Sequence, residues 1–423
     1  MQTDMNNNYT FTNKTKNITF GLMAIGLVTI IAGFLTDHGP EGATHETYHT
    51  GTRMWANLLV NGWFFMGIGL LATFFMALQH AAEVAWSVAV KRVYEAISSY
   101  LPIGAGVILL ILVCGQLQLH HLYHWMDPAV YKEFLEDGIT PNPAYDEVIV
   151  NKHGFFGAGN WFFWLRTLIY IGVWCWFQKG FLKSSVEQDL QGGTKLHFKT
   201  MGRAAKFLVF FAVTSSTASW DWMMSLDVHW FSTMYGWYSF AGMWISAMTT
   251  IILFVIYLKR KGYLEQVNDS HIHDLGKWVF AISFLWSYLW FCQFMLIWYT
   301  NIPEEIIYFQ DRLHSFGYMG LMWTVFAMNF AFPMILLMSR DAKRNYYFLV
   351  IVGSIIFLGH WLDVYMMVMP GTVNSHHSLG WMELGTALGF LGLMLFVVHK
   401  ALAKRPLMVA KHPYLDESLH HHY

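Results

Sequence analysis

The stretch YYFLVIVGSIIFLGHWLDVYMMVM (residues 346–369) decides the fold class, because its 24 residues include one acidic side chain and no lysine or arginine. A helix rises about 1.5 Å per residue, so a run of this length can cross about 30 Å of hydrocarbon. Comparable runs recur along the chain of 423 residues, which is 55% hydrophobic, 18% aromatic and only 13% charged. The sequence therefore predicts an all-α integral membrane protein with a single polytopic domain.

Working outward from this stretch, we predict about ten transmembrane helices. The predicted spans are 18–36, 55–79, 101–124, 155–178, 204–223, 233–258, 277–300, 315–338, 346–369 and 378–402. Segment 80–99 mixes apolar and charged residues at helical spacing, which indicates an interfacial helix rather than another span. Residues 403–423 form a polar tail after the last span.

Composition and motifs exclude several classes of function. A net charge of −1 gives no basic footprint for nucleic acid. The three cysteines lie inside apolar runs without the spacing of zinc, iron–sulfur or c-type haem sites. A b-type haem would need histidines on facing helices, and His120 or His124 opposite His360 is the only pairing that suggests itself. We therefore expect no metal and no haem bound by this chain.

The distribution of lysine and arginine predicts the orientation. With the N-terminus in the cytoplasm, 21 of the 26 basic residues fall in inner segments. Four fall in outer segments and Arg166 falls within a span. Because basic residues favour the cytoplasmic side, we expect both termini to be cytoplasmic, which agrees with an even number of spans. The apolar run after Lys14 and Lys16 lacks a small-residue cleavage site, so we interpret it as the first span and not as a signal peptide.

Two halves of the chain resemble each other. His153–Gly157 opens the fourth span as His314–Tyr318 opens the eighth. The fifth and ninth spans both carry Trp, Asp and a Met-Met pair near their outer ends. These similarities predict two related four-helix bundles, at 55–223 and 233–369, with two further helices. Chance in a biased composition is the alternative.

Ionisable residues at membrane depth are costly and often functional. They concentrate in the outer third of the predicted spans, where they could conduct protons or accept the hydroxyl proton of a quinol. The candidates are His120, His124, Asp221, Gln293, His360, Asp363 and Glu383. Arg166 lies nearest the midplane, and His80 and Glu83 are candidates for proton entry at the cytoplasmic end of the second span. We expect the outer polar residues to come from different helices and to face the bundle interior, since a carboxylate facing lipid would cost roughly 2.5–3.5 kcal/mol. These residues are Asp221, His229, His360, Asp363 and Glu383.

Three stretches resemble a known family. They are SWDWMMSLDVHW (219–230), FCQFMLIWYTNIPEE (291–305) and GHWLDVY (359–365). They are similar to the NrfD-like (polysulphide reductase type) membrane subunits of alternative complex III, most of all to the shorter, ActF-type subunit. Asp227 and His229 join the candidate residues through the first of these motifs.

The resemblance implies a subunit of a quinol:cytochrome c or quinol:terminal oxidase oxidoreductase in the bacterial inner membrane, not a stand-alone enzyme. It implies two four-helix bundles, no cofactor bound by the chain itself, and a role in proton movement, with menaquinol or ubiquinol as the ligand of any quinol site. The implied partners are a sister NrfD-like subunit, a periplasmic iron–sulfur subunit, multihaem cytochrome c subunits and lipids.

Two other classes of function remain open. A proton-coupled secondary transporter would have broken helices at the midplane, and the sequence has no paired Gly or Pro interruptions there. A structural scaffold subunit would hold Asp221, Asp363 and Glu383 in local hydrogen bonds, with no proton route between them.

Overall fold

The computed structural model describes residues 8–37, 50–135, 137, 139–152, 155 and 160–422. The described chain is helical, and eight of its helices are long and apolar enough to cross a membrane. These eight are α1 (Asn13–Thr36), α2 (Thr52–Ala81), the joined α3 and α4 (Trp86–Gln116), α9 (Met234–Arg260), α10 (Asp269–Thr300), the joined α12 and α13 (Met319–Leu336), α14 (Tyr346–Val373) and α15 (Trp381–Leu402). An all-α, multi-pass membrane fold is thus supported.

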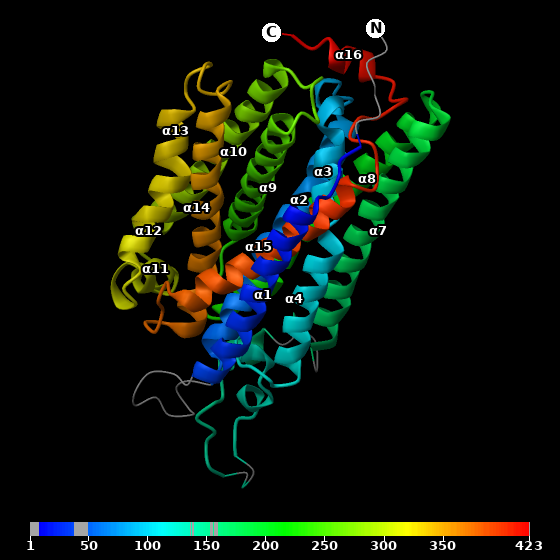
Figure 1. The fold of residues 1–423 in the computed structure, drawn as a ribbon. Helices are drawn as coiled ribbons and strands as arrows, with labels where there is room; N and C mark the ends of the chain where they lie inside the picture. The colour runs from blue at the N-terminus through cyan, green and yellow to red at the C-terminus, as the bar shows by residue number, and fades with distance from the viewer. Residues whose placement is uncertain are drawn as a thin grey trace.

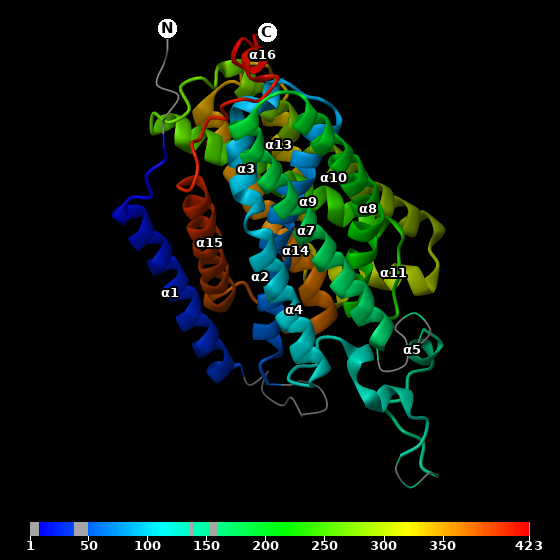
Figure 2. The same cartoon turned by 90° about the vertical axis from the view of Figure 1, so that its right-hand side faces the viewer.

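Two more long helices, α7 (Trp161–Gln191) and α8 (Lys195–Trp222), coincide with the fourth and fifth predicted spans. They carry more charged residues than the other eight, because each extends well beyond its apolar part into a charged segment. Figures 1 and 2 show both running alongside the other long helices. The short helices α5 (Glu147–Asn151), α11 (Pro303–Gln310) and α16 (Leu415–Leu419) lie in the connections and the tail.

Helix α2 is the centre of the packing. It contacts α4, α8, α9, α14 and α15, and most of its side chains are buried. On one side, α2, α4, α7 and α8 pack in a closed ring, and on the other α9, α10, α12–α13 and α14 do the same. Helix α1 packs almost entirely on α15, at the edge of the molecule (Figure 2).

Large apolar side chains cover the outer faces of the helices. Leu35, Trp176, Val209 and Ile335 are all more than 60% exposed. Polar side chains such as Asn57 and Asn61 are completely buried instead. An apolar exterior around a partly polar interior is what a lipid environment requires.

Both described ends of the chain lie at one end of the helix bundle (Figure 1). Asn8 forms an antiparallel bridge with Pro406, and the Tyr9 hydroxyl is 2.9 Å from Nδ1 of His399. The C-terminal tail also docks there, where the Ser418 hydroxyl donates to the carbonyl of Trp86. This arrangement agrees with an even number of crossings.

The prediction of an interfacial helix at 80–99 is wrong. Residues 91–98 form α3, and all eight are buried. This helix leads directly into α4 (Leu101–Gln116) and packs against α2, α9 and α15. Its charged residues are neutralised inside the protein, because Arg92 forms ion pairs with Glu95 and Asp189.

The third span ends earlier than predicted. Helix α4 ends at Gln116, so His120, His121 and His124 lie in the following loop and not at the end of a span. The cause is local, since Gln118 adopts a left-handed conformation with φ of 57° that ends the helix. The repeated motif at His153–Gly157 falls outside the described residues except for Phe155.

Candidate functional site

Three buried carboxylates lie toward the end of the bundle opposite the chain termini. Asp221 is the second-last residue of α8, Asp363 lies in the second half of α14, and Glu383 is in the first turn of α15. Their exposed fractions are 0%, 3% and 0%. The prediction that these acids come from different helices and face the protein interior is confirmed for all three.

Glu383 is fixed by a charged hydrogen-bond network. Arg53, at the start of α2, donates from Nε and Nη2 to the two carboxylate oxygens, at 2.8 and 2.9 Å. Nδ2 of Asn57 and the backbone N–H of Gly380 donate to the same carboxylate at 3.0 and 2.8 Å. Four donors around one carboxylate favour its ionised form and connect α2 to α15.

Asp221 has a similar partner from a different helix. Arg166 in α7 donates from Nε and Nη2 to the two carboxylate oxygens at 3.0 and 2.7 Å. The Tyr170 hydroxyl adds a longer bond of 3.4 Å. The guanidinium also lies over the rings of Phe155 and Phe162. The placement of Arg166 near the midplane is wrong, because α7 begins only at Trp161 and the pair sits one or two turns from that end.

Asp363 differs from the other two acids because no arginine or lysine in the described chain pairs with it. The Tyr238 hydroxyl donates to Oδ1, and the Trp286 indole donates to Oδ2 at 3.0 Å. Nδ1 of His360, one helical turn away, is 3.8 Å from Oδ2. Tyr238, Trp286 and the pair His360–Asp363 come from α9, α10 and α14.

A small cavity adjoins this acid. It measures about 10 Å³ and is lined by His360, Asp363, Ser239 and Ser246 among others. Both ring nitrogens of His360 and the hydroxyl of Ser239 lack hydrogen-bond partners in the described chain. A space of this size holds about one water molecule when polar groups surround it. The cavity beside the His360–Asp363 pair is therefore at the lower limit of size for one water molecule.

Further buried amides lie on the same half of the molecule. Gln293 in α10 is buried, and its Nε2 has no partner among the described residues. Asn329 was not predicted. It lies in a π-helical segment, Ala327–Ala331, completely buried beside Gly359, with both amide atoms unpaired. Since π-helical segments are frequent at functional sites, Asn329 extends the candidate site around His360.

The remaining outer candidates lie in loops and have local partners. His120 is buried, with Nε2 2.8 Å from the carbonyl of Ile111, and burial lowers its pKa. His124 is exposed at the start of a short 3₁₀ turn.

Asp227 and His229 lie in the loop between α8 and α9. Asp227 is 3.9 Å from Arg312, and burial raises the pKa of its carboxyl. His229 has a side chain that is 59% exposed, with Nε2 3.0 Å from Asp146. The expectation that His229 faces the bundle interior is wrong, because α8 ends at Trp222 and leaves it on the loop surface.

His80 and Glu83, the candidates for proton entry, belong to a cluster that sequence reasoning only half identified. His80, His197 and His412 are all buried, and one ligand atom from each lies within 4.8 Å of the others. Oε1 of Glu83 is 3.7 Å from Nε2 of His197. Burial lowers the pKa of His412 to about 3. This is the one described group of three histidines or acids with metal-like spacing, but Lys91 lines the same small cavity and its ammonium group disfavours a divalent cation.

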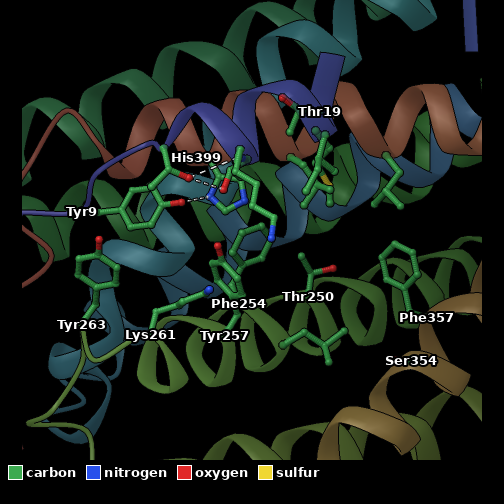
Figure 3. A pocket seen from close by; sticks show the side chains of 18 of the residues that line it. Tyr9, Thr19, Thr250, Phe254, Tyr257, Lys261, Tyr263, Ser354, Phe357 and His399 are labelled. Atoms are coloured by element: carbon green, nitrogen blue, oxygen red, sulfur yellow. Dashed lines mark hydrogen bonds between the residues drawn. The ribbon is translucent and has the colours of Figure 1, made fainter. Parts of the chain in front are cut away.

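A much larger cavity lies elsewhere. A groove of about 690 Å³ is lined by α1, α9, α14 and α15 near the chain termini. Figure 3 shows Tyr9 and His399 on one side of it, with Lys261 and Tyr263 toward one end and Thr250, Ser354 and Phe357 toward the other. None of the predicted site residues lines this groove.

Comparison with models of known protein families finds no match, and comparison with curated proteins likewise finds no matching relative.

Proposed function

We propose that this chain is an integral membrane subunit of a quinol-oxidising electron-transfer complex. We further propose that it supports proton movement through the ring of helices α9, α10, α12–α13 and α14. The observation that carries this proposal is the pair His360–Asp363. It is buried, lies beside space for a water molecule, and has no arginine or lysine partner in the described chain. A carboxyl group without a fixed counter-charge can gain and lose a proton, which a relay requires.

The proposal includes ten membrane crossings, with α7 and α8 added to the eight apolar spans. The two closed rings of helices support an arrangement as two related four-helix bundles. Asp221 and Asp363 support the same idea, because α8 and α14 are the last helix of each ring and each carries its acid in the half nearer its C-terminal end.

The family resemblance supplies the rest of the proposal. The chain would lie in a bacterial inner membrane with both termini cytoplasmic. It would assemble with a sister NrfD-like subunit, a periplasmic iron–sulfur subunit and multihaem cytochrome c subunits, which carry the redox cofactors. The acceptor would be cytochrome c or a terminal oxidase. Any quinol would bind near the periplasmic side, close to the buried acids.

The test is the substitution Asp363→Asn in the assembled complex. It keeps the shape of the side chain but removes the titratable proton. The amide oxygen can still accept from the Trp286 indole, and the amide NH2 would donate to the Tyr238 hydroxyl. Quinol-dependent turnover, or the proton movement coupled to it, should fall by about tenfold or more, since positioned proton-transfer groups contribute roughly 10²–10⁴-fold. Asp363→Glu, which restores a carboxyl, should recover part of the activity. Unchanged turnover and unchanged proton stoichiometry in Asp363→Asn would reject the proposal.

A scaffold role is the second candidate, and the two arginine pairs favour it. Asp221 and Glu383 each have a bidentate arginine partner, as expected for acids that connect helices and do not conduct protons. Normal proton movement in Asp363→Asn together with failed assembly in Glu383→Gln would identify the chain as a scaffold.

A further inference from the structure

The groove between α1, α9, α14 and α15, here called the terminal groove, has no part in the proton chemistry. Its α9 wall is a single helix face, formed by Thr250, Phe254, Tyr257 and Lys261 at intervals of three or four residues. Ile18 and Leu358 line it from α1 and α14, and both are more than half exposed. The groove is therefore open toward the surface that the membrane would cover.

The end of the terminal groove nearest the chain termini is cationic and rich in hydroxyl groups. Lys14 and Lys261 both line it and are exposed, and neither forms an ion pair within the described chain. Tyr263 lies beside them, with its hydroxyl 2.9 Å from that of Thr10. Two unpaired ammonium groups at a membrane interface attract an anionic headgroup.

The other end is apolar. Its walls are formed by Leu253 and Phe254 from α9, Phe357 from α14, and Leu391 and Leu395 from α15. Along α9, the distance from Lys261 to Thr250 corresponds to eleven residues, or roughly 16 Å. Half of a hydrocarbon core of about 30 Å is nearly the same length. The groove thus matches one acyl chain of one leaflet.

Hydrogen bonding argues against a quinone ring at the inner end. The Thr250 hydroxyl already donates to the Ser246 carbonyl at 2.8 Å, and the Ser354 hydroxyl donates to Val350 at 2.7 Å. Nearer the rim, the Thr19 hydroxyl donates to the Lys16 carbonyl. A quinone oxygen needs a free donor, whereas an acyl chain needs none.

We propose that the terminal groove binds one anionic phospholipid, with its phosphate between Lys14 and Lys261 and an acyl chain along Phe254, Phe357 and Leu391. The proposal requires that the protein is embedded in a membrane, and it is independent of any quinol or proton function. The lipid would fill a gap that α1 and α15 leave beside α9 and α14.

The experiment uses the full membrane assembly purified in mild detergent, with phosphatidylglycerol as the probe and native mass spectrometry as the readout. Wild-type protein should retain about one phosphatidylglycerol. The double variant Lys14→Gln with Lys261→Gln should bind this lipid roughly thirty-fold more weakly, because each lysine contributes about 1 kcal/mol of binding free energy and about 1.4 kcal/mol changes the affinity tenfold. Lys195→Gln with Lys199→Gln is the matched control, because these lysines are exposed near the same end of the bundle but do not line the groove. The control should bind like wild type.

A second variant tests the acyl-chain part of the site. Ser354→Trp places a large ring in the groove without changing a charge, and it should also reduce retention of phosphatidylglycerol. Retention that is unchanged in both groove variants would overturn the proposal. So would equal retention of zwitterionic phosphatidylethanolamine, or a quinone bound in place of the phospholipid.

Discussion

Arg53 and Arg166 determine what two of the three buried acids can do. Each guanidinium makes two hydrogen bonds to its carboxylate, and each joins two helices, α2 with α15 and α7 with α8. Such pairs cost desolvation free energy, so their net contribution to stability is small while both partners are present. Removing one partner has a much larger effect, because it leaves a buried charge unpaired.

The first prediction concerns the pair Arg166–Asp221. Asp221→Asn should destabilise the protein by about 3–5 kcal/mol, since the Arg166 side chain is largely buried. Adding Arg166→Gln removes the orphaned charge and should restore most of that loss. Thermal unfolding of the detergent-solubilised protein measures both variants. A double variant no more stable than Asp221→Asn would contradict the role assigned to the pair.

The second prediction concerns pH and His412. The usual imidazole pKa is 6.5 and its folded value is about 3, so the docked tail holds this ring neutral. Below pH 6.5 the undocked tail binds a proton that the docked tail does not. Docking should therefore weaken as the pH falls from about 6.5 toward 3, by up to about 1.4 kcal/mol per pH unit, and be insensitive above that range.

A fluorophore attached through Glu417→Cys would report docking of the tail. His412→Gln should flatten the pH dependence. The groups that face His412 are His80, His197, Lys91 and Arg92, and all are retained in the variant, so the difference between the two proteins isolates His412. An identical pH profile in both would show that this ring does not control docking.

For single residues, the sequence predicts which acidic side chains are buried better than it predicts which residues pair with them. A charged side chain inside an apolar run has a high desolvation free energy wherever the run lies. The sequence alone therefore identifies Asp221, Asp363 and Glu383. Arg53 was assigned to an outer segment without a partner, because its contact with Glu383 joins residues more than 300 positions apart. His197 and His412 escaped notice for the same reason.

Glycines determine the contact between α1 and α15. A Cβ at Gly389 would lie 2.5 Å from the Cα of Gly26, and one at Gly385 would meet the side chain of Thr29. Gly385 and Gly389 are four residues apart, the small-xxx-small spacing that lets membrane helices approach closely. This contact depends on shape alone and includes no ion pair.

The third prediction is that Gly389→Ala weakens this contact and destabilises the protein by about 1–3 kcal/mol, because the neighbouring atoms are backbone and cannot move aside. Gly172→Ala is the control, since a Cβ there meets nothing within 4 Å, and it should be neutral or slightly stabilising. Thermal unfolding compares the two. Equal stability would mean that α1 does not depend on this close approach.

The existence of the long helices could largely be predicted from the sequence, but the residues at which they begin and end could not. Apolar runs reveal a helix that can cross a membrane, but α7 continues to Gln191 through polar residues that hydropathy assigns to a loop. The π-helical segment Ala327–Ala331 was not predicted, because hydropathy does not distinguish it from an α-helix.

The whole molecule places Asp221, Asp363 and Glu383 toward the end of the bundle opposite its chain termini. The fourth prediction follows from the basic residues near the termini. A green fluorescent protein fused after Lys411 should fluoresce, and alkaline phosphatase at that site should be inactive, because the basic residues predict that this end is cytoplasmic. Fusions after Asp137, in the loop at the other end, should give the reverse result. Phosphatase activity after Lys411 would invert the orientation.

The pairing of α1 with α15 has a consequence for how the protein is made. Helix α1 is synthesised before the other long helices of the described chain, yet its main partner α15 follows all of them. Until then α1 must persist alone in lipid, which its strongly apolar surface allows. Its glycine face stays unoccupied throughout this period, so α1 is the element most open to association with a neighbouring protein during translation.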